Sequence, residues 1–178
     1  MISIVCFELI PEAIELSNLV QIFLWILIGV AGMIFCDQLV NKIYYKKEKI
    51  EGKSNSLLKT GIIVGIGLAI HNFPEGLAIG SGFEASAKLG LSLALAIAVH
   101  DVPEGISMSV PMKAGGMKAS KALLYTAISG ITTGIGAFFG GMLGNISQTV
   151  IACCLAFAAG AMLYIASRRI NPRIKQTI

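Results

Sequence analysis

The sequence predicts an all-α integral membrane protein, a bundle of about five full transmembrane helices preceded by a partial N-terminal helix. Of its 178 residues, 55% are hydrophobic and 13% are charged, and the mean hydropathy is +0.78. Soluble domains carry about 25% charged residues, roughly twice this share. The apolar residues also gather in blocks of about 20, which match the hydrocarbon thickness of a bilayer when they are helical. Membrane-spanning strands would be shorter and would alternate apolar with polar residues.

The apolar blocks follow one another in a regular series along what we expect to be one transmembrane domain, residues 1–178. Residues 1–17 form a shorter apolar piece that Glu8 interrupts, and they are too few to span a bilayer alone. Residues 46–56 are expected to be a basic loop between the first two spans. The five full spans are expected at residues 19–45, 57–83, 89–110, 119–141 and 147–166.

The basic residues predict the orientation of the bundle. Alternate connectors hold 13 of the 14 lysines and arginines, and six lysines lie within residues 42–59. Short loops rich in Lys and Arg remain on the cytoplasmic side of a membrane. We therefore expect loop 46–56 in the cytoplasm of a multi-pass plasma membrane protein, with Glu8, Glu12 and Glu15 outside. The net charge of +4 requires no nucleic-acid partner.

Two neighbouring spans contain the same pattern, HxxPEG. HNFPEG begins at His71 and HDVPEG begins at His100, 29 residues later. A histidine and a glutamate at positions i and i+4 lie on one face of a helix, one turn apart, so each pair can hold a cation from one side. The short connector makes the two helices antiparallel neighbours, and each motif lies near the middle of its span. His71, Glu75, His100 and Glu104 are therefore expected to meet at one depth and form a metal site.

Three acids in these two spans support the same interpretation. Glu75, Asp101 and Glu104 lie within apolar segments whose only basic residue is Lys59, at the far edge. Insertion scales assign roughly 2.5–3.5 kcal/mol to an acid at a helix centre, or on the order of 8–10 kcal/mol for three. A bound divalent cation, water in a cavity or protonation of the carboxylates would offset that cost.

The ligand types narrow the choice of ion. Imidazole with carboxylate suits Zn²⁺, and also Fe²⁺, Mn²⁺, Co²⁺ or Cd²⁺. The four cysteines form no CxxC pair and none lies in the motifs, so a structural thiolate cage is not expected. Asp37, near the cytoplasmic end of the first span, is a weaker candidate that lines an ion pathway or simply reaches water.

On these residues the chain resembles the ZIP family of metal-ion transporters. The two HxxPEG motifs are similar to those of the family's fourth and fifth helices. Four more segments resemble parts of the family's second, third, sixth and seventh helices. They are, in that order, residues 7–13, Asp37, Ser129-Gly130 and residues 155–162. The resemblance implies eight helices, often in a homodimer, with metal held between helices four and five. It implies one metal position lined by His71, Glu75, His100 and Glu104, and a second lined by Asn72 and Asp101 with both glutamates shared.

The chain departs from the family pattern in several places. It begins late in the second helix and ends after the seventh. Thr133 stands where many relatives have a glutamate that completes the second position. Asn41-Lys42 and residues 169–172 replace a Pro-His pair and an acidic run of the cytoplasmic exit. Because family helices are missing, we expect a chain that binds a cation but does not transport it efficiently alone.

Three functions compete at this point. Transport of a divalent cation, zinc first, is the leading hypothesis, and a non-transporting metal-binding remnant is the alternative. A membrane di-metal oxidase would need two Glu-x-x-His motifs, whereas this chain has only two histidines, in the order His-x-x-x-Glu. The HExxH motif of metalloproteases is also absent. We therefore expect no enzymatic activity.

Overall fold

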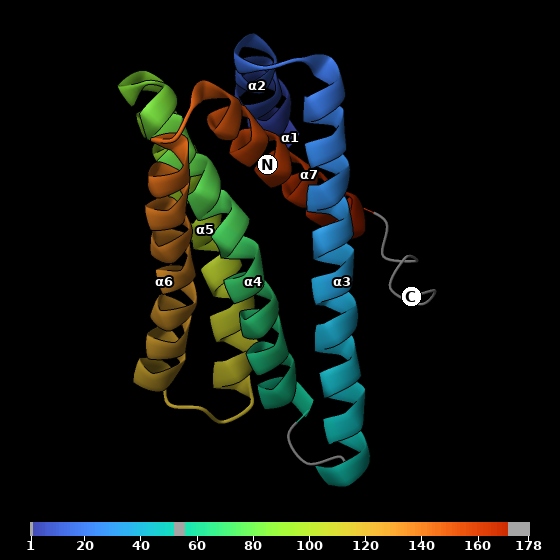
Figure 1. The fold of residues 1–178 in the computed structure, drawn as a ribbon. Helices are drawn as coiled ribbons and strands as arrows, with labels where there is room; N and C mark the ends of the chain where they lie inside the picture. The colour runs from blue at the N-terminus through green and yellow to red at the C-terminus, as the bar shows by residue number, and fades with distance from the viewer. Residues whose placement is uncertain (1, 52–55, 171–178) are drawn as a thin grey trace.

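The computed structural model describes residues 2–51 and 56–170, and helices are the regular elements throughout these ranges (Figure 1). Five of the helices are long and apolar enough to cross a membrane, which confirms the predicted fold class. The elements in chain order are α1 (Ile2–Ile4), the π-helix η1 (Val5–Leu9), α2 (Ile10–Leu16), α3 (Leu19–Glu51), α4 (Ser56–Ala85), α5 (Ala87–Ala114), α6 (Ala119–Gly144) and α7 (Gln148–Ile170).

The prediction of a loop at residues 46–56 is wrong in its first part, because helix α3 continues through Glu51. Residues 46–51 are lysines, glutamates and one isoleucine, all of which tolerate a helix, and the first strong breaker is Gly52. The apolar part that could span a membrane ends earlier, at Leu39. Residues 52–55 of the expected loop lie outside the described residues, and its last residue, Ser56, begins α4.

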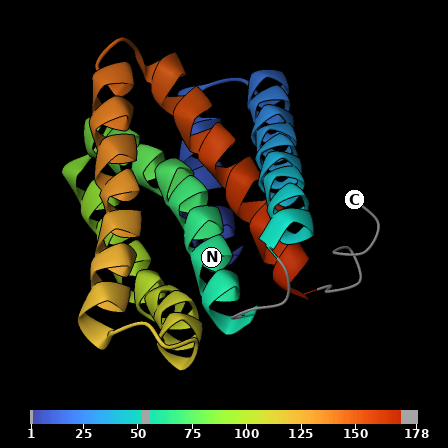
Figure 2. The same ribbon diagram turned by 90° about the horizontal axis from the view of Figure 1, so that it is seen from below.

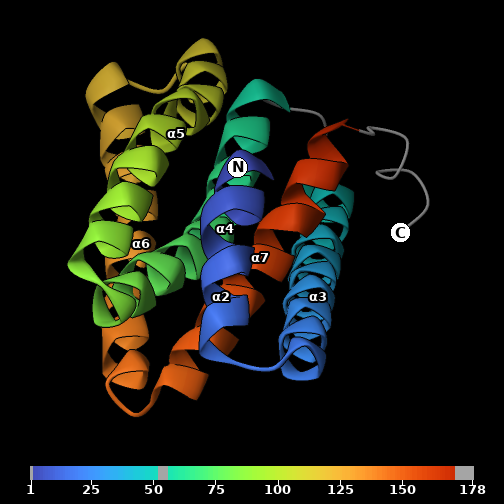
Figure 3. The same ribbon diagram turned by 90° about the horizontal axis from the view of Figure 1, so that it is seen from above.

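The N-terminal piece is helical from Ile2 to Leu16, with one π-helical turn at Val5–Leu9. Pro11 follows this turn and has no N–H to donate to the carbonyl four residues before it, which disfavours regular α-helical bonding there. Val5, Leu9 and Ala13 are fully buried in one apolar cluster with residues of α7. The partial helix is therefore part of the packed bundle, and Figure 3 shows α2 beside α7.

Helix α4 is the centre of the bundle. It packs against α5, α6 and α7, while α3 packs mainly against α7. Seen from below in Figure 2, α4 runs between α6 and α7, with α3 on the far side of α7. The two motif-bearing helices, α4 and α5, are therefore held together with α6 on one side of the molecule.

Glycines allow α4 and α6 to pack backbone against backbone. A Cβ atom on Gly76 would lie 2.0 Å from the carbonyl oxygen of Thr133, and one on Gly136 would lie 2.2 Å from that of Phe73. Gly80 and Gly140, one turn further along, make equally close contacts. Small residues at four-residue spacing are the usual means of close helix packing in membranes. This contact fixes α6 directly beside the first HxxPEG motif.

The outward faces of the long helices are apolar. On α6, for example, Leu123, Ile131 and Phe138 are all more than half exposed. Such faces suit hydrocarbon rather than water, because lipid tails are as apolar as these side chains. The chain is a multi-pass α-helical membrane protein.

Candidate metal centre

The two histidines lie near the middle of α4 and α5, which have 30 and 28 residues. The helices are joined by a tight connection at Ser86, whose hydroxyl caps α5 by accepting the N–H of Leu89 at 3.1 Å. The connection makes the helices antiparallel, so equal distances from it place both motifs at one depth. The structure thus brings the two HxxPEG motifs face to face.

Glu104 joins the two histidines. Its Oε1 atom lies 2.9 Å from Nε2 of His100 and 3.5 Å from Nε2 of His71. On the first helix, His71 Nε2 lies 3.5 Å from Oε1 of Glu75. Two ligands bound tetrahedrally to zinc at 2.0–2.1 Å would lie about 3.4 Å apart. The spacing of these donor atoms is therefore already close to what a shared divalent cation requires.

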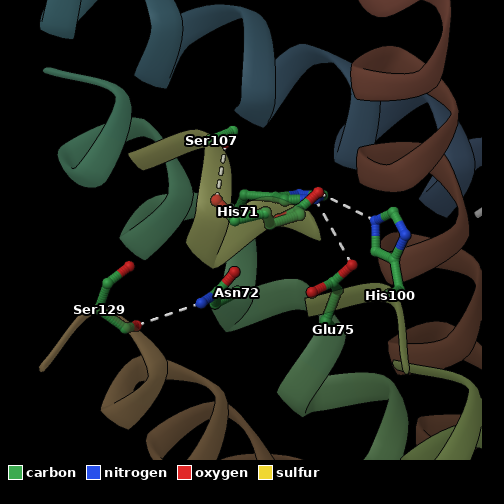
Figure 4. Close-up of polar contacts among 7 residues, drawn as sticks. His71, Asn72, Glu75, His100, Ser107 and Ser129 are labelled. Carbon is green, nitrogen blue, oxygen red and sulfur yellow. Dashed lines mark hydrogen bonds and ion pairs between the residues drawn. The ribbon is translucent and has the colours of Figure 1, made fainter. Parts of the chain in front are cut away.

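Most side chains of the cluster are buried. Glu75 is 1% exposed, His71 is 3% exposed and Glu104 is 4% exposed, while the His100 side chain remains 18% exposed. Figure 4 shows His71, Glu75 and His100 pointing toward one another from the two helices. Ligand atoms of His71, His100 and Glu104 all lie within 4.8 Å of one another. Two carboxylates and two imidazoles at this depth form an electronegative site that suits a cation.

Asn72 and Asp101 lie to one side of this cluster. They line a cavity of about 100 Å³ between α4, α5 and α6, which Glu104 also borders. The Asn72 side-chain nitrogen donates to the carbonyl oxygen of Ser129 on α6, at 3.2 Å (Figure 4). That bond turns the amide oxygen of Asn72 away from Ser129. Among the described residues, this oxygen and Oδ1 of Asp101 are buried without a hydrogen-bond partner.

Thr133 is the third polar group of this region. Its backbone lies against Gly76, the residue that follows Glu75, and its buried hydroxyl has no hydrogen-bond partner within the described part of the chain. Buried polar atoms are normally bonded, and each exception needs an explanation such as a bound ion or water. Thr133, Asn72 and Asp101 provide three such atoms around the two motifs. This arrangement suits additional oxygen ligation beside the histidine cluster.

The proline and glycine of each motif shape the backbone around the ligands. Pro74 and Pro103 both lie inside helices. Each lacks an N–H, so the carbonyls of Ile70 and Val99 lose their helical partners, which membranes tolerate beside protein or a water-filled cavity. The glycines pack toward α6, Gly76 against Thr133 and Gly105 near the methyl group of Thr126.

Asp37 is not part of the cluster. It lies half-buried on α3, and its Oδ2 accepts a hydrogen bond from the hydroxyl of Tyr164 on α7 at 2.8 Å. Asp37 therefore links α3 to α7 through this hydrogen bond. Its role in an ion pathway remains a prediction.

The contribution of Ser129 to the site could not be predicted from the sequence, where Ser129-Gly130 is only part of the family resemblance. The Ser129 carbonyl accepts a hydrogen bond from the Asn72 amide, and the Ser129 hydroxyl donates to the Gly65 carbonyl at 3.4 Å. Nothing in the residue type reveals a carbonyl contact from another helix. The small residues along α6 were the available signal, since they allow that helix to approach α4 closely.

The fold and the site define a class of protein. It is a helical membrane protein in which two antiparallel helices, each with an internal proline, place imidazole and carboxylate groups together near mid-span. A family model described as "ZIP Zinc transporter" matches residues 46–175. The chain belongs to this family.

Individual relatives agree with the family match. Zinc transporter GufA of Myxococcus xanthus is 37% identical over 123 residues, covering 68% of this chain and 48% of that protein. Zinc transporter ZupT of Clostridium perfringens is 38% identical over 138 residues, covering 74% and 48%. Zinc transporter ZIP11 of Xenopus tropicalis is 37% identical over 127 residues, covering 67% and 38%. The chain spans about half the length of the first two relatives.

Proposed function

We propose that this chain takes part in moving a divalent metal cation across the membrane, with zinc as the first choice. The observation that carries the proposal is the position of Glu104, which contacts imidazoles from both α4 and α5 at the centre of the bundle. Family membership supports the same function, as do the named relatives, which are zinc transporters.

The chemistry of the site favours a transported ion over a permanently held one. Its donors are imidazole and carboxylate, whereas tight structural zinc sites are built largely from thiolates. The described cysteines lie outside the cluster. A cation that enters between α4 and α5 would gain two carboxylates and two imidazoles and would offset the cost of the buried acids. Binding near mid-membrane between antiparallel helices is the arrangement from which secondary transporters alternate access.

In this mechanism His71, Glu75, His100 and Glu104 hold the cation. Asn72 and Asp101 provide oxygen ligands at the adjoining cavity, through which the cation passes toward the basic connectors. The chain lies in the plasma membrane in this mechanism. Its basic connectors face the cytoplasm, because short loops rich in Lys and Arg remain on that side.

Zinc uptake into proteoliposomes that contain the purified chain tests the proposal. The variants Glu104→Gln and His71→Ala should lower the zinc affinity of the chain at least tenfold, and should lower the rate of any saturable uptake by the same factor. Because the chain alone is expected to transport inefficiently, binding is measured beside uptake. Glu84→Gln is the control, since Glu84 is an exposed acid on α4, the helix that also carries His71. Uptake by Glu104→Gln at the wild-type rate would contradict the proposed site. Zinc binding by the wild-type chain without any uptake would leave the site in place and contradict transport by this chain.

A further inference from the structure

The end of the α4–α5–α6 bundle that faces the connector between α5 and α6 is filled by apolar side chains. Four of them are buried and form one cluster, which we term the apolar plug: Leu68 of α4, Met108 and Met112 of α5, and Ala122 of α6. Leu58, Val64 and Met117 pack around it. This end of the bundle carries Lys113, Lys118 and Lys121, so it is the basic end.

The plug borders the cavity of the candidate site. Leu68 and Met108 are members of the plug and also line the cavity, together with Asn72 and Glu104. Leu68 lies one helical turn before Asn72, and Met108 lies one turn after Glu104, both toward the basic end. The plug therefore fills the space between the polar side chains of the cavity and the connector.

Two glycines of α4 make room for the methionines. A Cβ atom on Gly65 would lie 2.4 Å from Cε of Met108, and one on Gly61 would lie 2.5 Å from Cγ of Met112. Unbranched methionine side chains change rotamer easily and adapt to their surroundings. At Gly65 the contact between α4 and α5 is made by the movable side chain of Met108, whereas nearer the connector, at Gly61, backbone atoms of α5 are also close.

We propose that the apolar plug is a closed gate on the basic side of the cavity. A cation crosses this side only when the side chain of Met108 leaves Gly65. A hydrophobic constriction excludes water and with it a hydrated ion, so the packed plug blocks passage without any charged group. The gate rests on the proposed function, because it presumes that the cavity holds a cation.

The gate can be tested by the reactivity of one cysteine inside the cavity. The reporter is Ser129→Cys, in a chain whose four native cysteines are replaced by alanine. Proteoliposomes are treated with a membrane-impermeant cationic methanethiosulfonate, and a separate Lys118→Cys reporter identifies vesicles whose basic end faces the reagent. With the plug intact, Ser129→Cys should react slowly from this side.

Two variants should open the gate by different routes. Met108→Ala removes the side chain, and Gly65→Ala displaces it while keeping its full length. Each should speed modification of the reporter at least tenfold from the basic side. Met108→Leu keeps an apolar side chain of similar volume and should remain slow. Leu123→Ala is the control, because Leu123 lies on α6 and is 69% exposed on its outer face.

Two results would overturn the gate. One is an equal reporter rate in the parent, Met108→Ala and Gly65→Ala chains. The other is a parent reporter that reacts as fast as Lys118→Cys. Zinc bound in the cavity should slow modification of Ser129→Cys. This protection tests the proposed function separately from the gate. If Met108→Ala speeds the reaction but zinc gives no protection, the gate stands and the cation cavity fails. If zinc protects but neither variant speeds the reaction, the cavity stands and the gate fails.

Discussion

Replacing Glu104 with glutamine should weaken metal binding without unfolding the bundle. The substitution keeps the size and shape of the side chain and removes only its charge. In the structure this carboxylate contacts Nε2 of both His71 and His100 from a buried position. Its loss therefore removes a charged ligand from the centre of the site.

The size of the effect follows from these contacts. Interactions that involve a charged hydrogen-bonding group are worth about 1.5–3 kcal/mol. Because about 1.4 kcal/mol corresponds to a tenfold change in affinity, the dissociation constant for Zn²⁺ or Cd²⁺ should rise about 10- to 150-fold. The metal-free chain should become more stable, because removing one acid from a helix centre relieves an insertion cost of up to roughly 2.5–3.5 kcal/mol.

A loss of metal affinity without a loss of metal-free stability distinguishes a metal ligand from a structural residue. Isothermal titration with Cd²⁺ would measure affinity in detergent, and thermal unfolding with and without Cd²⁺ would measure stability. We expect weaker binding, a metal-free melting temperature that does not fall, and a smaller shift on adding Cd²⁺. Glu84→Gln, a change of an exposed acid on the neighbouring helix α4, should leave both measurements unchanged. A lower melting temperature with a Cd²⁺ affinity within twofold of wild type would show that Glu104 supports the fold and is not a metal ligand.

Cysteines introduced at Lys118 and Lys88 should react with impermeant thiol reagents from opposite sides of the membrane, Lys118→Cys from the cytoplasm. These two exposed residues lie near the opposite ends of α5. Labelling of both from one side would contradict the topology. Gly136→Ala should destabilise the bundle by about 1–3 kcal/mol because its Cβ would lie 2.2 Å from the Phe73 carbonyl oxygen, whereas Gly134→Ala, with open space around it, should be neutral; equal melting temperatures would show that α4 and α6 are not so closely packed. Thr133→Glu should add a carboxylate beside Gly76 and raise the Cd²⁺ stoichiometry measured by equilibrium dialysis; an unchanged stoichiometry would show that position 133 does not complete a second metal position.

The sequence predicted most of the fold because bilayer thickness imposes a strong constraint. A block of about 20 apolar residues has few alternatives to a spanning helix, and five such helices are found. The end of α3 was predicted less well. Loss of hydropathy marked the end of the expected span at residue 45, but helix formation continues in water to Glu51. Hydropathy reports the membrane boundary, while the helix ends where its local sequence stops supporting it.

The candidate site could be predicted in part. The spacing of histidine and glutamate within one helix places both on one face, and the structure brings His71, Glu75, His100 and Glu104 together as that spacing indicates. The contributions of α6 could not be derived in the same way. The bond from Asn72 to the Ser129 carbonyl depends on how two helices pack, which no spacing within either helix specifies.

We expect a divalent cation to bind between α4 and α5 through imidazole and carboxylate ligands. Zinc K-edge X-ray absorption of the purified, zinc-loaded chain measures those ligands directly. We expect a first shell of nitrogen and oxygen at about 2.0–2.1 Å, with an imidazole signature that disappears in the double variant His71→Ala, His100→Ala. A first shell containing sulfur at about 2.3 Å, or an imidazole signature that survives the double variant, would show that the cation is bound elsewhere.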